Sequence, residues 1–195
     1  MRVSWNWLKQ LVDLKITAVE TAACLTKAGL EVEGLDRLDK GIHKVVTGKI
    51  LEVQPHPEAK KLVITKVDAG GEKPLTIVTG APNVMAGQSV AVALVGAKLP
   101  NETHPDIQLT TLRGVLSEGM MCGADELGMD VSKLTPEEKE GLYPLPEDTK
   151  PGLDIVPFLG LDDVVLDIGL TPNRSDCMGM INIAREASAL TGAPL

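Results

Sequence analysis

Residues 45–94 read VVTGKILEVQPHPEAKKLVITKVDAGGEKPLTIVTGAPNVMAGQSVAVAL, and the architecture of the chain follows from their pattern. Short runs rich in Val, Ile and Thr alternate with turn signals such as Pro-His-Pro, Gly-Gly and Gly-Ala-Pro-Asn, which predicts strands rather than long helices. With one further run, the predicted strands are Val45–Val53, Leu62–Asp68, Leu75–Thr79, Ser89–Leu94 and Ile107–Arg113. Several short strands at this spacing, without helices between them, favour a small barrel over a sheet of strand–helix–strand units.

The two ends of the chain have a different pattern. Thr17 and Glu20 form a capping box, which predicts a helix, and residues 180–190 predict another with its apolar side chains on one face. Residues 164–170 predict a strand, and residues 131–152, rich in Pro, Glu, Lys and Gly, predict a linker. Five is the number of strands in an OB-fold. We therefore expect a multidomain α+β chain in which a five-stranded OB-fold β-barrel, residues 40–151, is inserted in a small discontinuous outer helix/strand domain, residues 1–39 and 152–195.

The composition excludes several classes of protein. Of the 195 residues, 44% are hydrophobic and 24% are charged, which suits a folded globular chain and excludes wholesale disorder. No run of about 18 apolar residues occurs, so we expect no membrane-spanning helix. Three widely spaced cysteines predict neither a disulfide framework nor a zinc knuckle. Because unpaired cysteines are typical of a reducing compartment, we expect a cytoplasmic protein.

Charge is distributed unevenly along the chain. The net charge of −8 argues by itself against a nucleic-acid-binding protein. Residues 40–116, however, carry 9 basic and 6 acidic side chains, a net charge of +3, whereas residues 117–163 carry 3 basic and 12 acidic ones, a net charge of −9. Because the acidic segment repels phosphates, any contact with nucleic acid is expected from residues 40–116 and the positions just after them.

The sequence lacks the patterns of the common catalytic sites. It has neither a phosphate-binding glycine loop nor a GxSxG nucleophile motif, so we expect no nucleotide site and no hydrolytic triad. His43, His56 and His104 have no metal-ligand spacing to one another or to a cysteine. We therefore expect no catalytic residue, no cofactor site and no metal site in these 195 residues.

Three segments remain whose residue types suit contacts with a phosphate or a nucleobase. HPEAKKL (56–62) presents an imidazole and two ammonium groups at a turn, and IVTGAPNV (77–84) offers a glycine for close approach and an amide for base edges or ribose. LRGVLSEGMMC (112–122) places a guanidinium, a hydroxyl and a carboxylate around two glycines. Each segment also has a plain interpretation: a solvated loop, an ordinary turn, and a β-bulge with a buried methionine pair. The candidate contact residues are His56, Lys60, Lys61, Gly80, Asn83, Arg113, Ser117 and Glu118.

In this order the three segments resemble the signature of the tRNA-binding OB-fold module of EMAP II/Trbp-like proteins. The flanking sequences VSWNWLKQLVDL and AGLEVEG, the stretch APNVMAGQSVAVALVGAKLP, and LTPNRSDC followed by AREASALTG extend the likeness. Together they resemble the N-terminal portion of bacterial phenylalanyl-tRNA synthetase beta subunits, over residues 1 to about 192. One departure is Lys60, where the family often has Asp, so the charge of that loop differs from the family pattern.

The resemblance implies a tRNA-binding segment of a phenylalanine–tRNA ligase, in which the eight candidate residues contact tRNA. It implies tRNA(Phe) and the alpha subunit of a heterotetramer as partners, and an enzyme that charges tRNA(Phe) with phenylalanine. Activation then lies in the alpha subunit, so ATP and magnesium belong to the holoenzyme, and this segment alone is expected to be inactive. The tail ALTGAPL has no evident end signal, as in a fragment of a longer protein.

An alternative from another class is a structural docking module that supports assembly of synthetase subunits and has little contact with RNA. The net charge of −8 favours it, as does the lack of aromatic residues between positions 40 and 142. OB-folds that hold single strands stack bases on aromatic side chains, each worth about 1–3 kcal/mol. A folded RNA recognised through its shape and phosphates remains compatible with the sequence.

Overall fold

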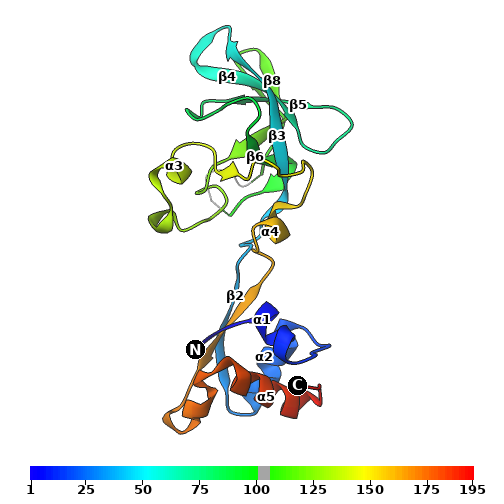
Figure 1. The fold of residues 1–195 in the computed structure, drawn as a ribbon, viewed down its shortest axis with the longest axis vertical. Coiled ribbons are helices and arrows are strands. Elements are labelled where there is room, and N and C mark those ends of the chain that lie inside the picture. Colours follow the sequence, from blue (N-terminus) through cyan, green and yellow to red (C-terminus); the bar gives the residue numbers. More distant parts are fainter. Residues whose placement is uncertain (101–105) are drawn as a thin grey trace. The chain divides into compact units, whose positions relative to one another are not determined.

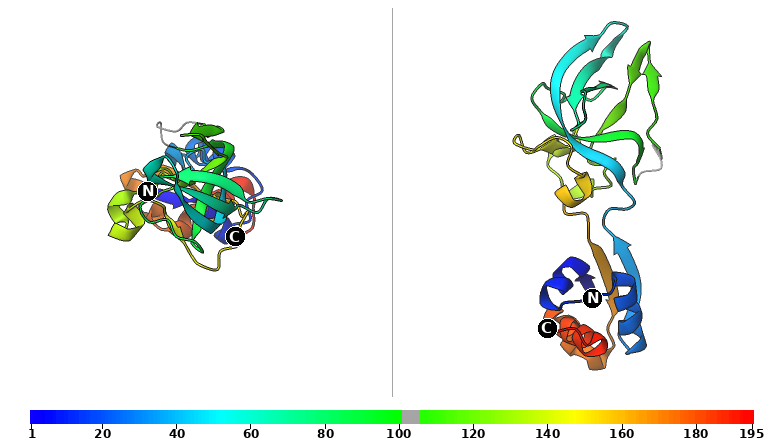
Figure 2. Two further views of the ribbon diagram at one scale, coloured as in Figure 1. Left: turned by 90° about the horizontal axis from the view of Figure 1, so that it is seen from above. Right: turned by 90° about the vertical axis from the view of Figure 1, so that its right-hand side faces the viewer.

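The computed structural model describes residues 1–100 and 106–195. Two compact units make up the chain: a discontinuous unit, residues 1–38 and 161–195, and a central unit, residues 39–160 (Figures 1 and 2). His104 lies outside the described residues. Within the described ranges, every helix is too short or too polar to cross a membrane.

A three-stranded antiparallel sheet forms the centre of the discontinuous unit. The strand from the C-terminal segment lies between the two from the N-terminal segment, in the order β1 (Arg2–Ser4), β11 (Val164–Gly169) and β2 (Glu31–Arg37). Beside the sheet lie α1 (Trp5–Leu11), α2 (Ala18–Lys27), the 3-10 helix η2 (Pro172–Met178) and α5 (Met180–Thr191) (Figure 1). The fully buried side chains of this unit, from the sheet, the helices and the loop before β2, include Leu8, Leu25, Leu30, Leu166, Ile168 and Ile183.

Local polar contacts begin the first two helices. The Ser4 hydroxyl accepts a hydrogen bond from the Trp7 amide, and Thr17 and Glu20 each accept a bond from the other's backbone amide. The predicted capping box is therefore confirmed. Such a cap stabilises a helix by about 1 kcal/mol because it satisfies amides that have no partner inside the helix.

A curled antiparallel sheet makes up most of the central unit (Figure 2). Its strand order is β10 (Pro144–Leu145), β6 (Ser89–Lys98), β3 (His43–His56), β4 (Ala59–Asp68) and β5 (Leu75–Thr79), and β9 (Gly119–Cys122) also pairs with β6. A separate hairpin and three short helices complete the unit: β7 (Thr110–Leu112), β8 (Val115–Ser117), η1 (Val131–Lys133), α3 (Pro136–Lys139) and α4 (Ile155–Phe158). The chain is thus α+β, and its central sheet is consistent with an OB-like fold.

The long strand β3 sits at the middle of this curl and depends on a glycine. A Cβ atom at Gly48 would lie 2.6 Å from Val92 Cγ2 and 3.1 Å from the Asp68 carbonyl oxygen. Side chains from β4 and β6 therefore pack over β3 at this point, where a Cβ would have no room. The hydrophobic core around Gly48 includes the fully or almost fully buried residues Ile50, Val67, Ile77, Val90, Met121 and Leu142.

The fifth predicted strand differs from the structure. The run 107–113 contains only the short β7, because Arg113 (φ 45°) and Gly114 (φ 83°) turn the chain into β8. The partner of β6 is instead β9, whose sequence Gly-Met-Met-Cys contains no β-branched residue and gives no strand signal.

The second half of the segment predicted as a linker is packed against the sheet, and β10 within it pairs with β6. Leu142 and Leu145 are buried, and a capping box of Thr135 and Glu138 begins α3. The proline and glutamate content of this segment is typical of linkers, so its composition did not predict the packing. The Thr-x-x-Glu pattern, however, is a helix signal.

Residues 152–160, expected in the outer domain, belong to the central unit. The Gly152 amide donates to the Thr47 carbonyl, and the Thr47 amide donates to the Leu153 carbonyl, both at 2.8 Å. A bridge between Val46 and Asp154 continues this pairing. Folding of each unit on its own stays a prediction.

Candidate nucleic-acid interface

Two hairpin turns lie near each other at one end of the central unit, where β4 and β8 are labelled in Figure 1. His56 joins them. Its Nε2 lies 3.2 Å from the Leu112 carbonyl oxygen in the β7–β8 hairpin, and its Nδ1 accepts the Glu58 amide at 3.1 Å in the β3–β4 turn. Because Nδ1 accepts a hydrogen bond, the ring proton lies on Nε2, which donates a hydrogen bond to the Leu112 carbonyl oxygen. His56 is only 5% exposed, and both of its ring nitrogens form hydrogen bonds within the protein.

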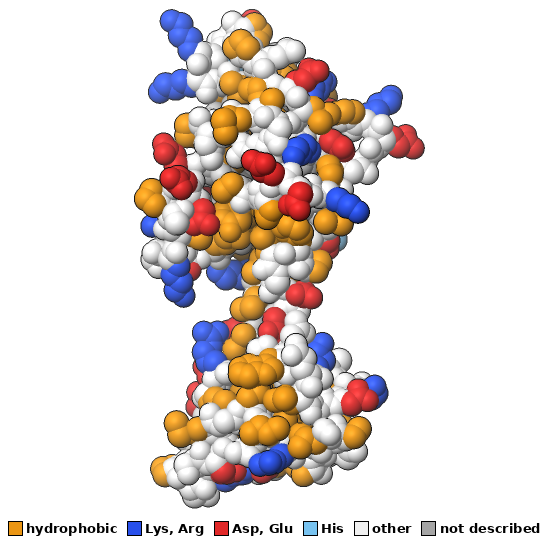
Figure 3. Space-filling model, viewed as in Figure 1, with side chains coloured by type: hydrophobic (Ala, Val, Ile, Leu, Met, Phe, Trp, Pro, Cys, Tyr) orange, Lys and Arg blue, Asp and Glu red, His pale blue; other side chains and the backbone are white. Residues whose placement is uncertain are grey.

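Three cations stand on these hairpins. Lys60 and Lys61 lie at the start of β4, and Arg113 occupies the β7–β8 turn; all three are exposed. None of them forms an ion pair with another described residue. Figure 3 shows Lys and Arg side chains protruding at this end of the unit. The geometry suits contact with phosphates, because the charges are neither neutralised nor buried.

Ser117 and Glu118 instead hold the outer edge of β5. The Val78 amide donates to Ser117 Oγ at 3.1 Å, and the Thr76 amide donates to Glu118 Oε2 at 2.8 Å. The Glu118 amide returns a bond to the Thr76 carbonyl at 2.8 Å. Two side-chain bonds and one backbone bond thus take the place of a strand ladder here. We call this contact between β5 and residues 117–118 the seam.

Asn83 also has a partner within the protein. Its Nδ2 donates to the Leu142 carbonyl at 2.9 Å, and its Oδ1 accepts the Leu142 amide at 2.8 Å. This pair of bonds fixes the segment that carries Leu142 into the core. The amide that the sequence offered for base edges is therefore occupied in this structure.

Gly80 and Ser117 line a cleft of about 710 Å³ beside the seam. Glu126 is half-buried in the same cleft and accepts the Gly123 amide at 2.6 Å. Burial is the main cause that raises the pKa of Glu126, and the neighbouring Asp125 carboxyl adds to it. No sequence motif marks Glu126 as different from the other acidic residues around it.

The thiol next to this cleft is not reactive. Cys122 is fully buried, and burial raises its pKa to about 12. Since the thiolate is the nucleophilic form, this cysteine stays protonated and inert near neutral pH.

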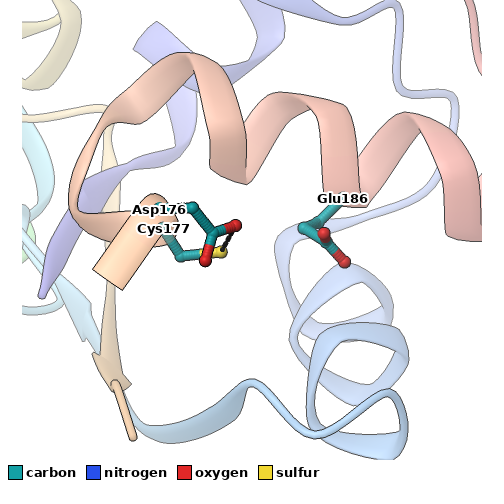
Figure 4. A group of neighbouring side chains, drawn as sticks. All are labelled: Asp176, Cys177 and Glu186. Atoms are coloured by element: carbon teal, nitrogen blue, oxygen red, sulfur yellow. Dashed lines mark hydrogen bonds between the residues drawn. The ribbon is translucent and has the colours of Figure 1, made fainter. Parts of the chain in front are cut away.

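A group of three possible metal ligands lies in the discontinuous unit, but it does not fit magnesium. Figure 4 shows Asp176 and Cys177 on η2 facing Glu186 on α5, with ligand atoms within 4.8 Å of one another. The Arg174 guanidinium contacts all three, at 2.7 Å from Glu186 and 2.9 Å from the Cys177 sulfur, and it holds the pKa of Asp176 below its ordinary value. Magnesium requires oxygen ligands in octahedral geometry, and a cation is already present here.

Comparison with known proteins identifies the class. Residues 45–154 match the family described as "Putative tRNA binding domain", which is more than half of the chain. The chain belongs to this family of tRNA-binding domains, and the prediction of a tRNA-binding module is confirmed.

The individual relatives are more specific. The chain is 54% identical over all 195 residues to the phenylalanine–tRNA ligase beta subunit of Moorella thermoacetica and 48% identical over 196 aligned residues to that of Trichormus variabilis. It covers 24% and 23% of these proteins, so it spans about a quarter of their length. Among solved structures, the C-terminal domain of Plasmodium vivax p43 is similar at a TM-score of 0.40 and 22% identity, over 58% of each chain.

Proposed function

We propose that the central unit contacts tRNA through the phosphates, using Lys60, Lys61 and Arg113. The observation that carries this proposal is the His56 bridge, which joins the hairpin bearing the two lysines to the hairpin bearing Arg113. Cations fixed on two linked turns match a phosphate pattern in a folded RNA without reading bases. In this proposal His56, Asn83, Ser117 and Glu118 shape the surface, and Gly80 lines the cleft beside them.

We propose further that the curled sheet is a five-stranded OB-type barrel built from β3, β4, β5, β6 and β9. The seam supports this, because it joins β5 to residues 117–118, which directly precede β9. Gly119 supports it as well, since a Cβ there would lie 2.7 Å from the Ala93 carbonyl oxygen, so β9 packs tightly on β6.

For the whole protein, we propose the beta subunit of a cytoplasmic phenylalanine–tRNA ligase, which works with an alpha subunit in charging tRNA(Phe). The relatives that match the chain along its entire length support this proposal. ATP and magnesium then act outside this segment, in agreement with the poor fit of the Asp176 group to magnesium. The segment binds RNA and supplies no reacting group.

The test is tRNA(Phe) binding by the 195-residue chain across a range of salt concentrations. Two or three phosphate contacts predict a log–log slope of roughly −2 to −3, at about 0.7–0.9 per contact. Lys61→Glu should weaken binding at low salt and leave thermal stability unchanged, because Lys61 is exposed.

Lys139→Glu is the matched control, since Lys139 is equally exposed but lies on α3 among acidic residues. It should change binding little. If tRNA binding is undetectable at low salt, or if Lys61→Glu and Lys139→Glu have the same effect, the phosphate-contact proposal is wrong and the docking module takes its place.

A further inference from the structure

The cleft beside the seam differs in character from the basic hairpins. One wall is the end of β5 and the turn after it, residues 78–81, and another is formed by residues 119–121 of β9. The last seam bond along β5 is at Val78, and residues 78–81 line a space of about 710 Å³. We call this space the seam cleft.

The wall made by the end of β5 and the turn after it has a backbone edge that the seam covers only in part. The amides of Thr76 and Val78 point away from β4, because they bond to Glu118 and Ser117. Alternation along a strand turns the Val78 carbonyl and the amide of Gly80 toward the same side. Among the described residues, the Gly80 amide has no hydrogen-bond partner. An edge of this kind can pair with an added extended segment.

The side chains of the seam cleft set the charge of what can enter. Its apolar lining includes Ile107, Met120 and Leu142, and its charged lining consists of two carboxylates, Asp106 and Glu126. No Lys or Arg lines the cleft in the described part of the chain. A phosphate backbone would be repelled here, whereas an apolar segment with a guanidinium or ammonium group would be attracted.

We propose that the seam cleft binds an extended basic segment of a partner protein. This segment pairs its backbone with the Val78 carbonyl and the Gly80 amide, beyond the part of β5 that the seam covers. It places apolar side chains against Met120 and Leu142, and sets an Arg or Lys side chain against Glu126. The half-buried Glu126 carboxylate forms no ion pair with a described residue, and an arriving cation would supply that missing charge. The proposal does not depend on tRNA binding, because none of Lys60, Lys61 and Arg113 lines the seam cleft.

The probe is a display library of random heptapeptides, selected on the immobilised 195-residue chain. We expect enrichment of sequences that combine β-branched or aliphatic residues with at least one Arg or Lys. A synthetic copy of the most enriched peptide should shift the Gly80 amide resonance in a nitrogen–proton correlation spectrum. Methylation of its backbone nitrogens at alternate positions should weaken binding at one set of positions only, since a strand presents alternate amides to its partner.

Glu126→Gln tests the charge pairing, with Glu137→Gln on the exposed face of α3 as the matched control. Glu126→Gln should weaken the peptide about tenfold, as expected for loss of a charge-assisted bond, and the control should not. Failure to enrich basic peptides, equal effects of the two variants, or an unmoved Gly80 resonance would overturn the proposal. So would an unstructured oligoribonucleotide that moves the same resonances and competes with the peptide. Binding of tRNA(Phe) is measured on the same variants, so that a failure of the peptide proposal can be distinguished from a failure of the proposed tRNA contact.

Discussion

His56→Asn and His56→Gln should affect tRNA binding differently, although each removes one of the two bonds that the imidazole makes. The Asn oxygen comes near the position of Nδ1, so it can still accept the Glu58 amide. The Gln amide comes near the position of Nε2, so it can still donate to the Leu112 carbonyl. Asn therefore keeps the bond inside the β3–β4 turn, and Gln keeps the bond between the hairpins.

The two variants should lose similar stability. A net hydrogen bond contributes about 1 kcal/mol, and His56 is 5% exposed, so the lost packing of the ring adds to this. We expect each variant to lose about 1–2 kcal/mol of the free energy of unfolding. Only His56→Asn frees the Arg113 turn from the lysine hairpin. That change removes one of three phosphate contacts and makes the salt slope shallower by about 0.7–0.9.

Urea unfolding and tRNA(Phe) binding at several salt concentrations measure both quantities. Arg113→Glu should weaken binding strongly in the wild-type chain and weakly in the His56→Asn chain, because the arginine there no longer shares a surface with the lysines. Equal binding losses for His56→Asn and His56→Gln would refute the bridge. So would an undiminished effect of Arg113→Glu after His56→Asn.

Three further results are expected. Ser117→Ala should cost about 1–3 kcal/mol in urea unfolding, since the buried Val78 amide loses its acceptor, while the exposed Ser175→Ala should cost nothing measurable; a shared midpoint would mean that the seam does not need the hydroxyl. Because burial raises the pKa of Glu126 in the folded chain, its ionised form opposes folding; Glu126→Gln should therefore raise stability at pH 7, and this gain should vanish as the pH falls below the ordinary carboxyl range, a trend that a gain growing toward low pH would contradict. Iodoacetamide at pH 8 should leave Cys122 unmodified in the folded chain and alkylate it in urea, and rapid labelling without urea would disprove its burial.

Local patterns in the sequence predicted much of the fold. Alternation and turn residues predicted the strands near β3, β4, β5 and β6, and the capping box predicted the start of α2. These signals act over a few residues, so they can be read without knowing the rest of the chain. The strand β9 escaped because its two methionines and glycine carry no strand preference, and its pairing with β6 decides its conformation.

The candidate site was harder to predict because its contacts join distant positions. Ser117 and Glu118 have residue types suited to RNA contact, yet their partners on β5 lie 39 and 42 positions away. Asn83 likewise meets a partner 59 positions away. A polar residue in a motif therefore does not reveal whether it serves a ligand or the scaffold. The exposed lysines and Arg113 could be selected from charge alone, since exposed turn residues seldom find internal partners.

The place of β11 between β1 and β2 also constrains how the chain can fold during synthesis. The first 38 residues emerge early, but their two strands have no neighbour until residue 169 has been made. At roughly 5–20 residues per second, those 131 residues take about 7–26 s. During that time Leu8, Leu25 and Leu30, which are fully buried in the finished structure, lack the part of their core that Leu166, Ile168 and Ile183 supply. The central unit, residues 39–160, is fully synthesised before β11. The discontinuous unit, whose two segments flank it in the sequence, is therefore the last to be completed.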